Sequence, residues 1–362
     1  MPRKMTVLTA ATELADADQF LIEQGGTNKR ITADLLPLPI SYIGGLITSN
    51  DTDADHDIAI APGIARSDDD AANMKLASIL TKQIDGAWAV GDAGGLDAGS
   101  VVANQLYSLW LIKRPDTGVV DVLFMRYATL VRVTTVGVNT TDDSYNDSGS
   151  GLDIFEPGQT VRVTGFTDPA NNGLKVVVSS TAAKLVVAEN LVTEAAGDTI
   201  SIATVGPALP TDYTKKRLIA AVKTEGSANI IPYTQSGDYF TYLVLVTDVT
   251  DASITDVTYE TGTLSVPPNA LAFIWGLLQN LTETDDEGIL TIQPIGFAES
   301  VVAGAAFIMA TIAGSTFKKT GTTGTVLTDG NSQVKYAATQ VAGSAIVSIR
   351  THGFLMLSRR DP

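Results

Sequence analysis

Residues 51–57 (DTDADHD) place alternating aspartates within one short stretch, as calcium-binding loops do. A calcium loop of the helix-loop-helix type needs glycine at its sixth position and glutamate at its twelfth. His56 and Pro62 occupy those two positions here. We therefore predict a solvated acidic turn, with a loosely bound surface Ca²⁺ as the alternative, and we interpret residues 67–73 (SDDDAAN) and 284–288 (TDDEG) in the same way.

Phosphate-binding and nucleophilic motifs are also incomplete. Residues 94–100 (GGLDAGS) imitate the spacing of a phosphate loop, but no lysine precedes Ser100, and Asp97 stands where a phosphate would approach. We predict a flexible loop. The only histidines, His56 and His352, belong to no H-E-x-x-H pair and follow no G-x-S-x-G elbow, so a Ser-His-Asp triad would have to use one of them. We expect His352 to be a turn or interface residue.

A glycosidase would need two carboxylates at the right spatial separation, and this sequence offers 40 acidic residues among which no pair stands out. An aromatic content of 6% counts against a cleft that stacks sugars. The absence of cysteine removes disulfides, thiolate catalysis and cysteine-type zinc sites. We therefore expect a protein that is not an enzyme and that uses no cofactor and no metal.

The net charge of −16 argues against a partner made of nucleic acid or anionic lipid, because few cations are left to neutralise phosphates. The N-terminal stretch lacks the continuous apolar core of a secretion signal. The most apolar stretch, residues 301–314, is shorter than the roughly 20 residues that a membrane-spanning helix needs. We predict a buried strand pair or core segment there, and no membrane insertion.

Valine, threonine, isoleucine and glycine are abundant, and helical periodicity is almost absent. This predicts a mainly β chain: several β-sandwich, jelly-roll-like or barrel modules in tandem, one inserted small β-domain and few short helices. The one helix candidate is residues 78–91, where Leu80, Ile84 and Trp88 would share one face and join the core.

Two hairpins follow from alternating apolar patterns. Residues 107–125 form an apolar strand, a turn at residues 115–118 and a second strand, with apolar residues on both faces, so we expect both faces to be covered. Residues 215–235 repeat this scheme around a turn at residues 225–227. We predict sheet in both places.

Residues 129–207, called the module below, carry their own strands separated by polar loops. The first and last strands each end in Thr-Val-Gly, which suits neighbouring strands that bring the segment's ends together. Close ends allow one domain to be inserted into another. We predict that residues 139–151 and 168–173 form receptor-facing loops, whose candidate residues are Asp142, Tyr145, Asn146, Asp168, Asn171 and Asn172. The alternative is that the module only thickens the protein or contacts a neighbouring subunit.

Near the N-terminus a small hairpin stands by itself. An apolar run precedes a turn at Gly25 and Gly26, a second strand follows, and Thr32 can cap a short turn before the stop at residues 37–39 (PLP). Because an isolated hairpin is marginal in water, we expect it to need a partner surface. The candidate contact residues are Phe20, Leu21, Ile22, Ile31, Leu35 and Leu36. The alternative is that the hairpin folds back onto the chain's own next domain.

The predicted organisation has four parts. Residues 1–39 form an attachment segment, residues 40–128 plus 208–246 a β-rich host domain, residues 129–207 the inserted module and residues 247–362 a C-terminal β-domain. In the last part, alanine and glycine are frequent in the strands predicted at residues 301–314 and 341–349. Such small residues permit close approach of another backbone or subunit, which hints at self-association.

Three segments, namely WLIKRPDTGVVDVLF (110–124), LPTDYTKKRLIAAVKTEGSANIIPYTQ (209–235) and TSNDTDADHDIAIAPGIARSDD (48–69), resemble a family of tailed-bacteriophage and prophage virion proteins, usually labelled tail fibre or tail-associated. The opening segment, residues 8–36, resembles the short N-terminal modules of many phage fibres. In these relatives the DVLF strand runs almost directly into the LP-x-x-YTKKR segment, which supports the insertion. The module is itself similar to small β-modules of phage structural proteins.

The resemblance covers most of residues 8–128 and 208–240 and fades in the C-terminal third, where only Gly353, Phe354 and the Arg359-Arg360 pair match the relatives' ending. It implies a structural protein of the virion, made in the host cytoplasm, most simply a tail fibre or tail-associated adhesin that docks through its N-terminus. It also implies a homotrimer whose partners are other virion proteins and a host receptor or glycan. The alternatives are a capsid or neck fibre and a glycan-degrading tailspike.

Overall fold

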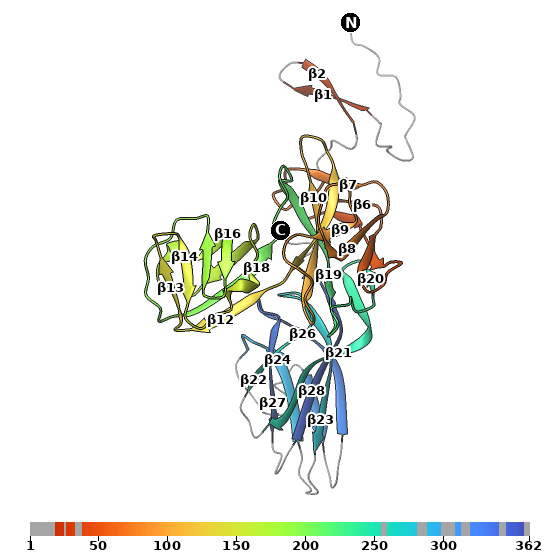
Figure 1. Cartoon of the computed structure of the whole chain (residues 1–362). Helices are drawn as coiled ribbons and strands as arrows, with labels where there is room; N and C mark the ends of the chain where they lie inside the picture. The colour runs from red at the N-terminus through yellow and green to blue at the C-terminus, as the bar shows by residue number, and fades with distance from the viewer. Residues whose placement is uncertain are drawn as a thin grey trace.

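The computed structural model describes residues 19–24, 27–32, 38–254, 259–280, 288–297, 308–312, 319–339 and 345–357. Strands account for 57% of the chain and helices for 3%, and the strands form several sheets. This confirms the prediction of a mainly β chain with several β modules and few short helices. In Figure 1 the first sheet lies between the N-terminal hairpin and the C-terminal strands, and the module lies to one side.

The first sheet has seven strands in the order β19-β10-β11-β9-β8-β5-β4. They are β4 (Thr48–Asn50), β5 (Asp57–Ile60), β8 (Leu80–Ala87), β9 (Gly94–Leu96), β10 (Leu106–Lys113), β11 (Val120–Arg126) and β19 (Lys215–Lys223). A three-stranded sheet of order β3-β6-β7 packs beside it. Its strands are β3 (Ile43–Gly45), β6 (Gly63–Arg66) and β7 (Asn73–Leu76).

The hairpin predicted at residues 107–125 is confirmed, because β10 and β11 pair antiparallel with Lys113 opposite Val120. β19 pairs with the other edge of β10. Both faces of β10 are covered, as predicted, since four consecutive side chains are at most 5% exposed: Leu109, Trp110, Leu111 and Ile112. β10 is therefore the internal strand on which this half of the sheet is built.

A buried ion pair crosses this sheet. Lys82 on β8 is 1% exposed, and its Nζ lies 2.8 Å from the Oδ1 of Asp121 on β11. The indole Nε1 of Trp88 donates to Asp121 Oδ2 at 3.1 Å, and Lys82 Nζ also donates to the carbonyl of Asp92 at 2.9 Å. A buried charge is tolerated only when such partners satisfy it, so this pair ties β8 to β11.

The helix predicted at residues 78–91 is wrong, because β8 occupies its centre. A spacing of four residues fits one face of a helix, but it also fits one face of a strand, whose side chains alternate with a period of two. Lys82 and Ile84 are buried while Asp85 and Ala87 are exposed, which is the strand pattern. Ile84 does join the core, and Leu80 and Trp88 pack against it, so that part of the prediction is confirmed.

The flexible loop predicted at residues 94–100 is also wrong at its start, because β9 is a strand that runs parallel to both β8 and β11. Its glycines serve close packing: a Cβ on Gly94 would lie 2.2 Å from the carbonyl oxygen of Ala87, and one on Gly95 would lie 2.9 Å from the Phe124 ring. These glycines let a third strand enter a crowded sheet.

The second predicted hairpin, residues 215–235, is right only in its first part. β19 leads into a turn that Thr224 and Ile230 close by an antiparallel bridge. The chain then leaves this sheet, since β20 (Tyr233–Ser236) pairs with β21 (Tyr239–Ile254).

The module forms a second seven-stranded sheet in the order β12-β18-β15-β16-β17-β14-β13. Its strands are β12 (Thr129–Val133), β13 (Val136–Asn139), β14 (Ser144–Asp147), β15 (Thr160–Thr164), β16 (Gly173–Thr181), β17 (Lys184–Val187) and β18 (Thr199–Gly206). Two short 3₁₀ helices, η2 (Leu152–Ile154) and η3 (Pro169–Asn171), join them. The predicted pairing of first and last strands is confirmed, with Thr129 opposite Ala203.

The module has its own hydrophobic core. Alternate residues of β15 and β18 point inward, and the buried cluster to which they belong contains only residues 128–202. A second cluster of buried apolar residues runs from β3 to the C-terminal strands and contains no residue of the module. The chain leaves the first sheet after β11, builds the module and returns to the same sheet at β19.

The C-terminal strands form two sheets, of order β20-β21-β28-β23-β26 and β22-β27-β24-β25. The strands not yet named are β22 (Glu260–Thr263), β23 (Leu271–Asn280), β24 (Gly288–Pro294), β25 (Ile308–Ile312), β26 (Lys319–Leu327), β27 (Gln333–Thr339) and β28 (Ala345–Leu355). The boundary predicted between residues 246 and 247 falls inside β21. The small-residue strands predicted at 301–314 and 341–349 lie partly outside the described residues, and β28 pairs with β21 and β23 of its own chain.

The separate core of the module leads to a first prediction. A chain in which Ala128 is joined directly to Ala208 should fold and unfold cooperatively, because β10, β11 and β19 keep their pairing. Circular dichroism and thermal unfolding measure this. Loss of the β signal of the first sheet would show that the module is needed for that sheet to form.

A second prediction concerns Asp97, which follows β9. Ala208 N and Gln159 Nε2 donate to its Oδ2 at 3.0 and 3.2 Å, so it joins the first sheet to the module. Burial outweighs these hydrogen bonds and raises its pKa to about 6. Between about pH 4 and pH 6 the folded chain therefore holds a proton that the unfolded chain has released, and the free energy of unfolding falls as the pH rises through this window.

Asp97→Asn should remove that fall and raise the free energy of unfolding at pH 7 by about 1–3 kcal/mol. Urea unfolding at a series of pH values from 4 to 7 checks the slope, with the exposed Asp116→Asn as the control variant. If the free energy of unfolding changed with pH in the same way for the wild type and Asp97→Asn, Asp97 would not be the group that causes the fall.

Candidate attachment junction and interdomain groove

The N-terminal hairpin is a sheet of its own. β1 (Gln19–Gln24) pairs antiparallel with β2 (Thr27–Thr32), with Phe20 opposite Ile31 and Leu21 opposite Arg30. Neither strand pairs with any other strand in the part of the chain that the structure describes. Of the predicted attachment residues, Phe20, Leu21, Ile22 and Ile31 lie in this hairpin, and Leu35 and Leu36 lie outside the described residues. Figure 1 shows the hairpin apart from the first sheet.

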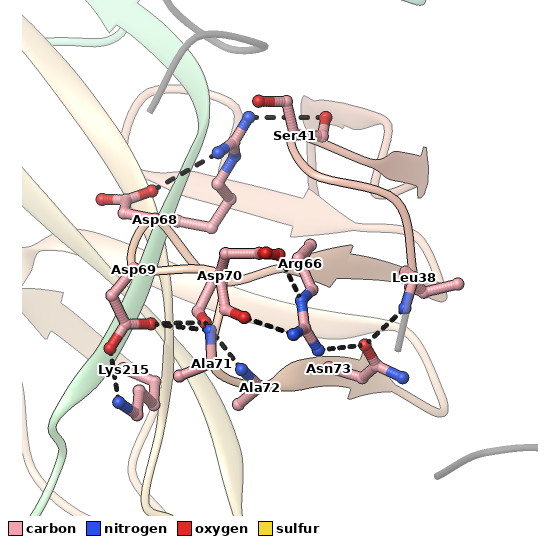
Figure 2. Close-up of polar contacts among 12 residues, drawn as sticks. Leu38, Ser41, Arg66, Asp68, Asp69, Asp70, Ala71, Ala72, Asn73 and Lys215 are labelled. Atoms are coloured by element: carbon pink, nitrogen blue, oxygen red, sulfur yellow. Dashed lines mark hydrogen bonds and ion pairs between the residues drawn. The ribbon is translucent and has the colours of Figure 1, made fainter. Parts of the chain in front are cut away.

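The chain that enters the host domain is held at a polar junction (Figure 2). The amide of Leu38 donates to Asn73 Oδ1 at 3.2 Å, and the amide of Arg66 donates to the carbonyl of Tyr42 at 2.9 Å. A turn between them is closed by Tyr42 N donating to the carbonyl of Pro39 at 3.1 Å. The backbone at residues 38–42 is thus fixed to β6 and β7.

Arg66 is the centre of this junction. It is 8% exposed, and its Nε donates to Asp70 Oδ1 at 2.7 Å while its Nη1 donates to Asn73 Oδ1 at 3.0 Å. Its Nη2 donates to the carbonyl of Asp70. Because Asn73 Oδ1 also receives the amide of Leu38, one guanidinium connects the acidic turn, β7 and the entering chain. Charge-assisted bonds of this kind are the stronger ones in proteins.

Three consecutive aspartates meet four cationic side chains here. Asp70 pairs with Arg66, Asp69 pairs with Lys215 and Asp68 pairs with Lys216 at 3.2 Å. Arg217, buried on β19, lies 3.7 Å from Asp68 and donates to the carbonyl of Ser41 at 3.5 Å. These contacts clamp the small β3-β6-β7 sheet to β19, and Figure 2 shows those of Asp70 with Arg66 and of Asp69 with Lys215.

The local electrostatics differ between neighbouring aspartates. Burial raises the pKa of Asp68, and the nearby Lys216 and Arg217 only partly offset this. Burial also acts to raise the pKa of Asp69, but hydrogen bonds from Lys215 and Ser67 outweigh it and lower that pKa. Sequence reasoning treated the SDDD stretch as a solvated turn. The signal that it missed is the pairing of Asp68 and Asp69 with the Lys215-Lys216-Arg217 triplet.

The prediction of two receptor-facing loops is partly wrong. Tyr145 lies in β14 and is fully buried, where its hydroxyl donates to the carbonyl of Asn171 at 2.7 Å and its ring stacks on Phe166. Asn171 is also fully buried, and its Nδ2 donates to Glu194 Oε2 at 2.8 Å. Neither side chain can face a receptor, because burial in the module's own core occupies both.

The other loop residues are more accessible. Asp142 is exposed and pairs with Lys184 at 2.6 Å, while Asn146, Asp168 and Asn172 are partly buried. Asn172 Nδ2 donates to the carbonyls of Phe166 and Asp168, so these residues brace the turn that begins at η3. The structure therefore brings Asp168, Asn171 and Asn172 together at η3. Asp142 lies on the surface in the other loop and is not part of this group.

A groove between the module, the first sheet and the C-terminal strands was not predicted. Two cavities of about 510 and 380 Å³ adjoin there, and Tyr127 and Pro268 line both. Lys216 Nζ lies 4.7 Å from the centre of the Trp110 ring, and the exposed Arg162 makes no ion pair with a residue that the structure describes. Aromatic surface beside a charged group at a domain interface is typical of ligand sites.

The groove escaped sequence reasoning because its walls come from distant segments. β10, β15, β18, β19 and the turn at residues 268–269 are brought together only by folding. No spacing of residues within one segment of the sequence indicates that these residues line a common groove.

The remaining sequence motifs have structural roles. In the acidic turn, Asp51 accepts from Thr81 Oγ1 at 2.6 Å, and Asp53 Oδ2 lies 3.1 Å from His56 Nδ1, whose pKa this contact raises. His352 lies within β28, stacked on Phe273, and not in a turn.

Within the described ranges, no group of three or more histidine, aspartate or glutamate side chains is placed to hold a metal ion. In those same ranges no helix has the length and apolarity needed to cross a membrane.

Comparison with known proteins adds no relative: no family model matches this sequence, and no curated protein matches it significantly.

The junction leads to a third prediction. Arg66→Ala should lower the free energy of unfolding by about 2–3 kcal/mol, because it removes several charge-assisted hydrogen bonds from a buried site. It should also speed hydrogen exchange at the amides of Leu38 and Tyr42. The matched control is Arg114→Ala, which removes solvent-accessible ion pairs with Asp116 and Asp212 and should cost less than about 1 kcal/mol. Equal effects of the two variants would contradict the proposed role of Arg66.

Proposed function

We propose that this chain is a structural component of a tailed-phage virion, a tail fibre or tail-associated adhesin that docks through its N-terminal hairpin. The observation that carries the proposal is the contrast between a two-stranded sheet without a described partner and the firmly bonded junction that follows it. A hairpin of this size needs a covering surface to be stable, and another virion protein would supply it. The phage-like segments in the sequence point in the same direction.

The junction fits this role mechanically. An appendage must transmit force between its anchor and its distal domains, and the Arg66 and Asp68 contacts join the entering chain to β19 through charged bonds. β19 is in turn paired with the buried β10. A pull on the hairpin would therefore be resisted by the core of the host domain.

The distal parts would contact the host cell and other copies of the chain. The module lies to one side of the first sheet in Figure 1, and its exposed Asp142 and the groove beside Arg162 are available for contact with a receptor or glycan. The proposed assembly is a homotrimer, as fibres commonly are symmetric oligomers. The proposed location is the virion, after synthesis in the host cytoplasm.

Deleting residues 1–39 should give a folded, soluble chain that no longer enters particles, because in this proposal the segment supplies a docking surface. The measurement is the copy number on purified particles, with circular dichroism of the free protein as the folding check.

A second variant keeps the chain length. Phe20→Asp with Ile31→Asp places two charges opposite each other in the hairpin, and Thr27→Asp with Gln24→Asp does the same at its far end as the control. Only the first pair replaces apolar residues of the predicted attachment surface, so only that variant should fail to enter particles. A normal copy number after the deletion would contradict the proposal that the N-terminal segment is the anchor. A separate experiment, labelling the protein on intact particles, would distinguish a tail position from a capsid or neck position.

A further inference from the structure

β23 is apolar on both of its faces. Its inward residues Ala272, Ile274 and Leu278 are fully buried. Its outward residues Leu271, Phe273, Trp275 and Leu277 are also apolar, yet each is partly exposed. A strand that is apolar on both faces is typical of a strand covered on both faces, as β10 is in this same chain.

The inward face of β23 is covered by the opposite sheet. A Cβ on Gly276 would lie 3.0 Å from Ile292 and 3.2 Å from Leu290, both on β24. On the outward face, the aromatic side chains of β23 contact neighbours in the same sheet. Phe273 stacks on Tyr239 and His352 with ring centres 6.0 and 5.9 Å apart, and the Trp275 ring lies against Gly321 on β26. Tyr239 extends this aromatic row and is 53% exposed.

Arg350 is the charged group at the centre of the outward face. It lies opposite Trp275 in the sheet, and its guanidinium carbon lies 5.2 Å from the centre of the Trp275 ring. Its Nε is buried and has no hydrogen-bond partner, and its side chain forms no ion pair within the described part of the chain. The cation–π contact offsets part of the cost of burying this donor, but an acceptor is still missing.

We propose that a second copy of this chain covers this outward face, so that the assembly is held together by the β23 side of the sheet β20-β21-β28-β23-β26. Small residues on the neighbouring strand allow the approach, since Gly321, Thr323 and Thr325 on β26 leave little side chain in the way. A copy of this chain can also supply the acceptor that Arg350 lacks, because the chain carries 40 acidic residues. The inference rests on the homo-oligomer in the proposed function and gives it an interface.

The test places bulk and charge beside the apolar row without touching the core. Thr323 pairs with Trp275, Thr325 pairs with Phe273, and both threonines are exposed, so Thr323→Arg with Thr325→Arg should leave each chain folded. The control is Thr164→Arg, the same change at an exposed position on β15 of the module. Light scattering after size exclusion, on the full chain at micromolar concentration, measures the mass.

The wild type and Thr164→Arg should have the mass of several chains. The double variant should have the mass of one chain, or its assembly should weaken at least ~10-fold. A wild type with the mass of one chain overturns the inference, and so does a double variant that assembles as the control does. Because this readout uses protein in solution, it stays independent of particle incorporation, which tests the anchor.

Tryptophan fluorescence gives a second measurement on protein that stays folded. If the outward face is covered in the assembly, diluting the wild type should shift the emission to longer wavelength as Trp275 meets water. The conservative Trp275→Phe variant should lose that shift, because Trp110 remains in the core and Trp88 in its bond to Asp121. A dilution shift that persists in Trp275→Phe would place the interface elsewhere and overturn the inference.

Discussion

The pairing of β10 with β19 is the constraint on which the rest of the structure depends. β10 is buried on both faces, so each of its edges needs a partner, and β19 reaches it only after the whole module has been built. Closing such a long loop costs chain entropy, but that cost grows only slowly with loop length. The apolar β10 can therefore hold β11 and β19 together while the module forms a separate core beside them.

β19 also transmits this constraint to the N-terminal side. Its first residues, Lys215, Lys216 and Arg217, meet the acidic turn before β7, and the same turn accepts the guanidinium of Arg66. The chain entering at Leu38 is bonded to the same cluster through Asn73. The orientation of the proposed anchor is thus set by a strand far away in the sequence, through short charged contacts in a partly buried setting where screening by salt is weak.

The two apolar strands β10 and β23 make an informative pair. Both are apolar at successive positions, and sequence reasoning predicted that the first would be covered on both sides. Folding of one chain covers β10 completely and covers only the inward side of β23. The difference identifies a surface whose composition is that of an interior, and it is the reason for assigning that surface to contact between copies.

The sequence by itself determined the mainly β class, the hairpin at β10 and β11, the pairing of the module's first and last strands and the small hairpin at the N-terminus, because turn residues and a period of two act over short distances. It misassigned β8, because a four-residue spacing suits a helix and a strand alike. It also placed Tyr145 and Asn171 on the surface, because polar loop composition does not reveal that distant partners bury them. The Arg66 junction, the groove beside Arg162 and the outward row of β23 were decided by tertiary structure alone, since each joins side chains that only long-range packing brings into contact.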